Sequence, residues 1–224
     1  MKSIEFSDRI KKVAPNLKVL QIEAEVKNPA TSDLLWSEIE EVAKELKNKY
    51  QLPELNKRRA IAATRAAYKA LGKDPNRYRP SAEALGRRII QDKGIYRLTT
   101  LIDVINLISI KSGYSIGGFD SDKIEGDALI LDAGTSEDIF NAIGRGQLNI
   151  EGLPVYRDLR GGIGTPTSDE ERTKLTPETT HLLMLVNIYE EDQSSDEIEK
   201  LVHDLLSRHA GLTSYQALLN HCSQ

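Results

Sequence analysis

The sequence predicts an α+β fold with a mixed β-sheet core and packed helices. Helical periodicity dominates the first half of the chain, whereas alternating or continuous apolar segments dominate the second half. The 224 residues contain no internal repeat and suit one compact domain over 1–224. Hydrophobic residues make up 39% and charged residues 29%, which is typical of a folded globular protein with a proper core.

The first half begins with a predicted strand and two long helices. Residues 17–26 alternate between apolar and polar side chains, which indicates a half-buried strand. A helix is predicted over 31–50, where Ser32 or Asp33 can cap its start. A second helix spans 53–72, and its alanine-rich interior lets another backbone approach closely.

Two shorter helices follow a stiff loop over 73–80, which ends in a proline. The first begins near Ser81. The second is predicted over 100–109, where Thr100 and Asp103 have the spacing of a capping box. This second helix is apolar over much of its surface, so we expect it to be buried.

The remaining chain is richer in strands. The predicted strands are 114–119, 127–132, 153–157 and 181–189. Between the last two lies a polar, glycine-rich loop over 160–176. Ser194 and Glu197 form a capping box for a closing helix, and a short tail helix is predicted from Thr213.

Composition excludes several classes of protein. Cys222 is the one cysteine, so a disulfide framework and a cysteine zinc site are excluded. The histidines lack metal-ligand spacing, and no apolar run approaches the ~20 residues of a membrane span. The charged N-terminus is unlike a signal peptide. We therefore expect a cytoplasmic protein with no metal, no cofactor and no membrane association.

Positive charge is concentrated in one part of the chain. The segment 57–97 holds twelve Lys and Arg against three acids, which gives +9 there and −13 elsewhere, since the total is −4. Such a block can neutralise RNA phosphates, or it can be a solvated face that pairs with acids elsewhere. The candidate phosphate-binding residues are Arg58, Arg65, Lys69, Arg87 and Arg88.

Four polar residues, three inside this block and one after it, each allow two interpretations. Arg79, Glu83 and Arg87 can form a structural ion-pair network or line a polar pocket. Asn106 lies on the apolar helix between Ile102 and Ile110, and a buried amide needs partners. It either ties a loop to the core or hydrogen-bonds a ligand.

The glycine-rich and charged loops carry no standard catalytic motif. Gly117 and Gly118 allow a close backbone approach, but neither they nor the glycines over 160–164 match a nucleotide-binding loop. The charged segment 168–173 is typical of a solvated loop. The sequence has no GxSxG, no HExxH and no Cys–His arrangement, so a catalytic triad is not expected.

Three segments together resemble the B3/B4 domain family, which includes the editing module of the phenylalanyl-tRNA synthetase beta subunit and free-standing proteins. They are KDPNRYRPSAEALGRRI, LIDVINLISIKSGYSIGGFDSDKIEGD and SDEERTKLTPETTHLLMLV. The resemblance covers roughly residues 55–190. It implies an α+β core there, with 1–54 and 191–224 as additions packed on it.

The resemblance also implies an activity. In the synthetase, this module hydrolyses the ester of tyrosine wrongly attached to phenylalanine tRNA by positioning a water molecule, without a covalent nucleophile. The family's pocket asparagine matches Asn106, whereas its editing histidine is replaced by Gly117. No aminoacylation motif is present, so we do not expect the chain to charge tRNA.

These observations lead to three functional hypotheses. The first is an aminoacyl-tRNA ester hydrolase that acts in trans, with Asn106, Gly117 and Gly118 as its catalytic pocket. The second is a non-catalytic module that binds tRNA or an amino acid and partners a synthetase. The third is a small-molecule hydrolase or sensor. The expected substrate-binding residues are Arg79, Glu83, Asp120, Asp169, Arg172 and Thr173.

Overall fold

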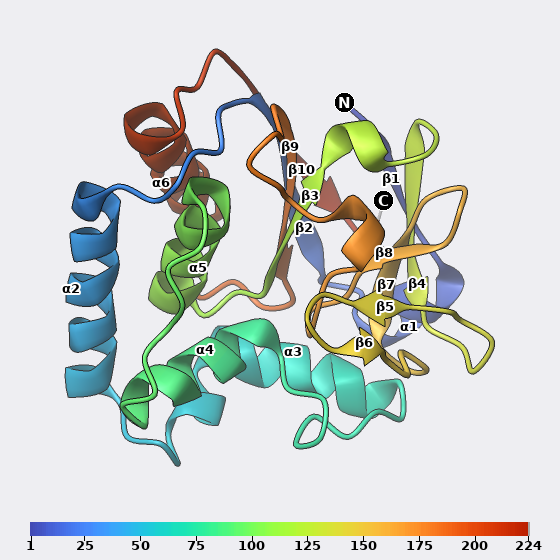
Figure 1. The fold of residues 1–224 in the computed structure, drawn as a ribbon. Coiled ribbons are helices and arrows are strands. Elements are labelled where there is room, and N and C mark those ends of the chain that lie inside the picture. Colours follow the sequence, from blue (N-terminus) through green and yellow to red (C-terminus); the bar gives the residue numbers. More distant parts are fainter. Residues whose placement is uncertain (224) are drawn as a thin grey trace.

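The computed structural model describes residues 1–223, and its helices and strands form distinct layers (Figure 1). The helices are α1 (Asp8–Val13), α2 (Asp33–Lys49), α3 (Arg59–Ala70), α4 (Ser81–Ile90), α5 (Thr100–Ser112) and α6 (Ser195–His209). The strands are β1 (Ser3–Phe6), β2 (Lys18–Glu25), β3 (Ile116–Asp120), β4 (Ala128–Ala133), β5 (Asn141–Ala142), β6 (Gly146–Gln147), β7 (Pro154–Arg157), β8 (Gly162–Gly164), β9 (His181–Ile188) and β10 (Ser214–His221).

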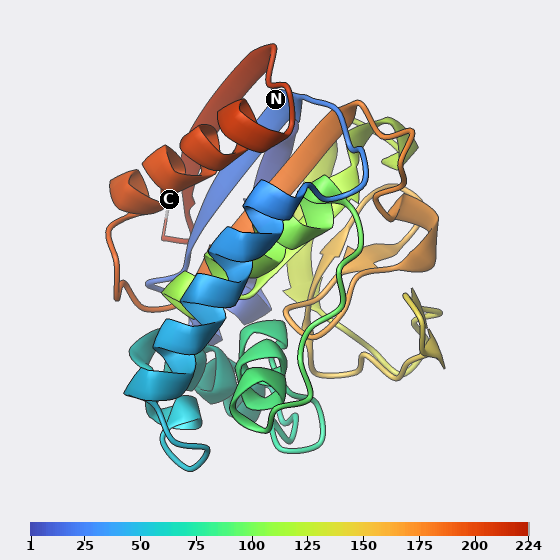
Figure 2. The same ribbon diagram turned by 60° about the vertical axis from the view of Figure 1, so that its left-hand side comes forward.

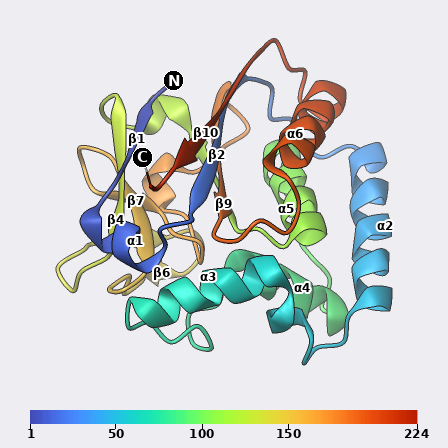
Figure 3. The ribbon, with the colours of Figure 1, turned by 180° about the vertical axis from the view of Figure 1, so that it is seen from behind.

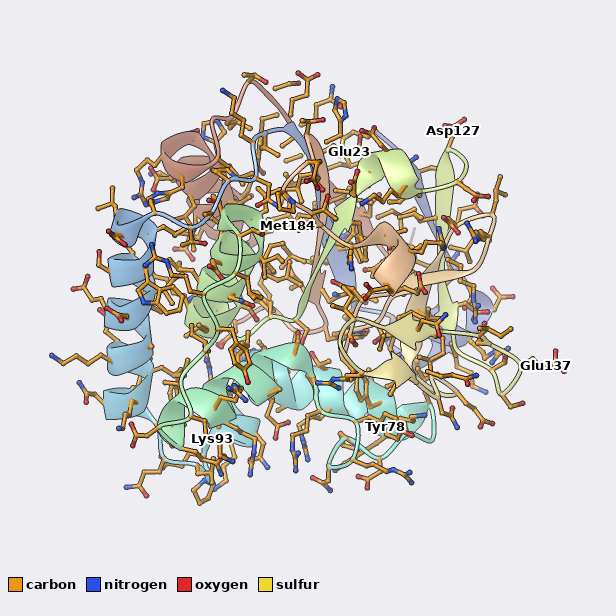
Figure 4. All side chains as sticks on the ribbon, viewed as in Figure 1. Glu23, Tyr78, Lys93, Asp127, Glu137 and Met184 are labelled. Atoms are coloured by element: carbon orange, nitrogen blue, oxygen red, sulfur yellow. The ribbon has the colours of Figure 1, made fainter. Side chains whose placement is uncertain are left out.

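One sheet is antiparallel throughout and has the order β10-β2-β9-β3. The apolar run of β9 makes it a central strand, because all of its residues after His181 are buried. Gly118 of β3 lies opposite Met184 of β9. Met184 lies in the interior beside α5 (Figure 4). The expected central strand over 181–189 is therefore confirmed.

The second sheet is mixed and has the order β1-β4-β7-β8. β1 runs parallel to β4, whereas β4, β7 and β8 are antiparallel neighbours. β5 and β6 form a separate small hairpin. The α+β class with a mixed sheet is thus confirmed, although the strands divide into two main sheets.

The helices cover the first sheet from one side. α5 and α6 lie over that face, and α2 packs on the outer side of α5 (Figure 2). The apolar residues of α5 and α6 pack on alternate residues of β2 and β9. The second sheet and α1 pack against the opposite face, where Phe119 and Tyr156 are fully buried. α3 and α4 run across one end of both sheets (Figure 1).

Helix starts and the C-terminal segment differ from the sequence predictions. α3 begins at Arg59, after a short 3-10 turn over 55–57, because the chain from Pro53 forms turns first. The predicted capping box at Thr100 is wrong, since Thr99 is the N-cap and makes no side-chain capping bond. The Ser194–Glu197 capping box is confirmed.

The predicted tail helix from Thr213 is also wrong. Residues 214–221 form β10, which pairs along its whole length with β2. Gly211, with φ +56°, ends the preceding turn and directs the chain back along the sheet. The free edge of β2 thus gains a full ladder of backbone hydrogen bonds, which outweighs a weak local helix preference.

Candidate functional site

The candidate site lies at the outer edge of β3. β9 pairs with one side of β3, and the other side faces the loop that follows β8 (165–176). The predicted loop over 160–176 is thus partly wrong, because Gly162–Gly164 form β8. In this loop, the Asp169 carboxylate accepts the backbone N–H of Gly118, with an N···O distance of 3.3 Å. The structure therefore brings together Gly117, Gly118 and Asp169, three residues that the sequence places about 50 positions apart.

A fully buried aromatic ring fills the space beside Gly117. A Cβ added to Gly117 would lie 2.6 Å from Cζ of Phe119, and one added to Gly164 would lie 2.5 Å from the same atom. Both glycines are therefore required by the ring of Phe119. The side chain of a histidine at 117 would compete with this ring for the same volume.

Asp169 has a free carboxylate oxygen at this place. Oδ2 accepts from Gly118, whereas within residues 1–223 no hydrogen bond reaches Oδ1. Oδ1 would be 3.6 Å from a Cβ on Gly117, so it lies next to the position that the ring of Phe119 fills. Burial raises the pKa of Asp169 to about 7, against the lowering effect of the Gly118 hydrogen bond.

Asn106 lies on the neighbouring helix α5 and is half-buried. The preceding residue, Ile105, packs directly on β3, because its Cδ1 would be 2.3 Å from a Cβ on Gly118. One turn earlier on α5, burial raises the pKa of the Asp103 carboxyl, although its hydrogen bonds oppose that rise. This carboxylate accepts from the hydroxyl of Thr31 and from the N–H of Leu98. Asn106 therefore lies on α5 one turn after a buried polar cluster.

Two of the expected substrate-binding residues anchor the loop. Arg172 makes two hydrogen bonds to the buried Asp158, both at 2.8 Å, and a longer one to the carbonyl of Lys123. Thr173 is fully buried. These contacts hold the loop that carries Asp169, so both residues act on the site through that loop.

Asp120, at the end of β3, is also engaged within the protein. Its Oδ2 accepts from the hydroxyl of Thr179 at 2.9 Å and pairs with Lys123 at 3.1 Å. Its Oδ1 caps the following turn at the N–H of Asp122. Asp120 therefore fixes the end of β3 and the start of β9 relative to each other.

The expected meeting of Arg79, Glu83 and Arg87 is observed. Glu83 is 1% exposed and lies 3.9 Å from Arg79 and 3.8 Å from Arg87. Its closest partner is Arg65 at 2.7 Å. Arg65 also donates to Pro75 and Asn76, so its guanidinium is committed inside the protein. One carboxylate thus faces three guanidinium groups, and Arg79 and Arg87 keep most of their donors free.

The predicted stripe of Arg58, Arg65 and Lys69 does not form a continuous basic surface. Arg65 is 9% exposed. Arg58 precedes α3 and donates to the carbonyls of Ile110 and Lys111 at the end of α5. Lys69 remains exposed.

Arg88 is likewise engaged close to its own helix. It donates to the carbonyls of Lys93 and Gly94, and it lies over the ring of Tyr96. Of the five expected phosphate-binding residues, Lys69 and Arg87 keep side-chain donors without a close hydrogen bond within residues 1–223.

The start of α4 lies against the loop that carries Asp169. The N–H of Ser81 donates to the carbonyl of Pro166 at 2.8 Å, and Tyr68 of α3 shares a 2.8 Å hydrogen bond with Thr167. Arg79 lies two residues before Ser81. The segment that carries Arg79 therefore packs on the loop that carries Asp169.

Neither a metal cluster nor a membrane helix is found in the described part of the chain. Within residues 1–223, no group of three or more His, Cys, Asp and Glu side chains could hold an ion. No helix there is long and apolar enough to cross a membrane.

Sequence reasoning missed several residues that build the site. Phe119 was expected only as part of a motif, and Asp158 and Tyr68 were not expected at all. Their roles depend on contacts between distant segments, such as Asp158 with Arg172. The two glycines at 117 and 164 were the available signal, because each marks a place where another group approaches closely.

Fold and site together define an α+β domain in which a charged loop closes a glycine-containing strand edge. The chain belongs to the B3/4 domain family, whose model matches residues 63–222. Among solved structures, it is similar to an N-terminal fragment of the phenylalanyl-tRNA synthetase beta subunit from Pyrococcus horikoshii. The TM-score is 0.50 and the identity 13%, over 97% of this chain and 54% of that one. A search of curated proteins finds no match.

Proposed function

We propose that this protein hydrolyses the ester bond of mischarged aminoacyl-tRNA in trans, at the edge of β3. The observation that supports the proposal is the Asp169 carboxylate, which accepts from the Gly118 N–H and lies beside Gly117 and the ring of Phe119. Membership of the B3/4 domain family and the likeness to a synthetase fragment support this class of substrate. Asn106 lies one residue beyond Ile105, which packs on the same strand.

In this proposal, Asp169 is the general base. Its carboxylate takes a proton from a water molecule, and the water oxygen attacks the carbonyl carbon of the ester. The bond from that carbon to the ribose oxygen breaks, and the proton passes to the ribose oxygen. The products are the free amino acid and tRNA with its terminal hydroxyl restored. A pKa of about 7 suits a base that works near neutral pH.

The proposed RNA contact lies on the adjoining surface. Arg79 and Arg87 stand at 3.9 and 3.8 Å from the one carboxylate of Glu83, so each has guanidinium donors for a phosphate. Lys69 is exposed near the end of α3. Buried Arg65 and the engaged Arg58 and Arg88 support the surface without contacting RNA directly.

A second candidate is a non-catalytic module that binds tRNA or an amino acid and partners a synthetase. The absence of a side chain at Gly117, with Phe119 filling the adjacent space, favours it. In that case the site keeps its shape for recognition and activates no water.

The two candidates are separated by an Asp169→Asn variant. The amide keeps an oxygen that can accept from Gly118 but cannot take up the proton of a water molecule. The hydrolase proposal predicts that deacylation falls by about 100-fold or more while tRNA affinity is unchanged. The matched control is Asp127→Asn, an exposed carboxylate in the turn before β4 (Figure 4), which should keep full activity. No ester loss with wild-type protein on any charged tRNA, with tRNA still bound, supports the non-catalytic module.

A further inference from the structure

Within residues 1–223, nothing pairs with one edge of the antiparallel sheet, the outer edge of β10. The backbone N–H of Cys222 donates to the carbonyl of Leu17, and the backbone N–H of Val26 donates to the carbonyl of Thr180. In β2, the odd-numbered residues therefore form backbone hydrogen bonds with β10, and the even-numbered residues form them with β9. On β10, the backbone N–H and C=O groups of the even-numbered residues therefore point toward β2. The N–H and C=O groups of Tyr215, Ala217 and Leu219 point away from the sheet.

The other sheet edges are blunted. β3 is closed by Asp169 and by a bridge from Phe119 to Lys174. β8 is closed by the segment after it, through a bridge from Gly164 to Asp169. β1 is short, spanning Ser3–Phe6, and carries a charge at Glu5. Natural sheets protect their edges by such coverage, shortness and charge.

β10 has none of these protections. It is eight residues long, and its sequence SYQALLNH contains no proline, lysine, arginine or acid. Leu218 is 48% exposed on this strand. It lines a groove of about 470 Å³ with the apolar side chains of Ile4 and Phe6. β10 and β2 lie side by side at the back of the molecule (Figure 3). A long, uncharged open edge of this kind favours pairing with another strand.

We propose that β10 is a dimerisation edge that pairs antiparallel with β10 of a second copy of this chain. The two sheets then join into one continuous sheet across a twofold axis. Charge supports the antiparallel direction. Glu25 of β2 lies opposite Ser214 at one end of β10. At the other end, Lys18 lies opposite His221, and Lys11 lines the groove together with Glu5. Antiparallel pairing sets the acidic end of one copy against the basic end of the other.

The test measures the mass of the full chain by sedimentation velocity and by light scattering after size exclusion, at tens of micromolar. We expect a dimer for the wild-type protein. In Ala217→Pro, proline removes only an N–H that points away from β2, so the fold is kept and the dimer is lost. Leu218→Lys places a charge on the edge and should also give a monomer.

The matched control is Leu159→Lys, which adds the same charge at a side chain that is 83% exposed and lies outside β10. This variant should remain a dimer, and circular dichroism should show native structure for all variants. A monomeric wild-type protein overturns the proposal, and so does a folded Leu218→Lys variant that stays dimeric. If Ala217→Pro does not fold, Leu218→Lys and its control decide the question. This inference does not depend on the proposed hydrolysis.

Discussion

At the scale of single residues, Asp169 holds a carboxyl group where ionisation is costly. Burial raises its pKa from 3.8 to about 7, and one backbone N–H offsets this only in part. The native protein therefore binds this proton more tightly than the unfolded chain does. Its contribution to the free energy of unfolding falls as pH rises from about 4 to about 7 and stays low above that.

The first prediction concerns the stability of Asp169→Asn. Since the amide never ionises, the variant should gain stability relative to wild type as pH rises, with the largest difference above about pH 7. Urea unfolding of both proteins over a pH series measures this difference. A constant difference at all pH values would show that Asp169 is ionised normally in the folded protein.

The second prediction concerns the position of the missing histidine. Gly117→His would introduce the histidine that the resemblance implies at this position, but its Cβ alone would come within 2.6 Å of Phe119. We expect a loss of about 1–3 kcal/mol in the free energy of unfolding and no gain in deacylation, because Phe119 must move. Urea unfolding and an ester-hydrolysis assay measure the two effects. A stable, faster variant would contradict this account of the site.

At the scale of elements, the contact between α3 and α4 depends on a buried ion pair. Arg65 and Glu83 are both nearly inaccessible and lie 2.7 Å apart. Removing either side chain leaves the charge of the other one buried without its closest ion-pair partner. This pair therefore holds the two helices that carry the proposed RNA surface.

The third prediction is that Arg65→Met lowers the free energy of unfolding by about 3 kcal/mol or more, because Glu83 loses its closest partner. The control is Lys47→Met, which breaks the exposed pair with Asp92 and should cost less than about 1 kcal/mol. Urea unfolding of both variants gives the comparison. Equal losses would mean that the buried pair adds nothing beyond a surface contact.

Local sequence patterns predicted most of the longer helices and strands, but they did not predict which strands pair with one another. The alternation over 17–26 and the apolar run of β9 were sufficient for two central strands. β1 and β10 were missed, because β1 is only four residues long and β10 pairs with a strand almost 200 positions earlier. The same limit applies to the site, where Asn106 and the glycines were expected but the Phe119 ring and Asp158 were not.

At the scale of the whole molecule, positive charge is concentrated in one segment of a chain that is acidic overall. The chain carries −4 in total, yet 57–97 carries +9. Several of those cations are committed to internal contacts, which leaves Arg79, Arg87 and Lys69 among those available. Long-range attraction of RNA to this surface should therefore be modest and sensitive to salt.

The fourth prediction follows for tRNA binding. The logarithm of the association constant should fall linearly with the logarithm of salt concentration, and Arg79→Ala and Arg87→Ala should each reduce that slope by about 1. Filter binding or fluorescence titration at several salt concentrations measures it. A Glu45→Ala variant, at an exposed carboxylate of α2, should leave the slope unchanged. A binding constant insensitive to salt would remove the proposed phosphate contacts.

The most direct test of the central claim is a deacylation screen with wild-type protein and Asp169→Asn. Both are incubated with a panel of correctly and incorrectly charged tRNAs, and loss of the ester is followed against a buffer blank. The hydrolase account predicts that wild-type protein removes the amino acid from one or a few mischarged species and that Asp169→Asn does not. Intact esters throughout, or equal rates for both proteins, would contradict it.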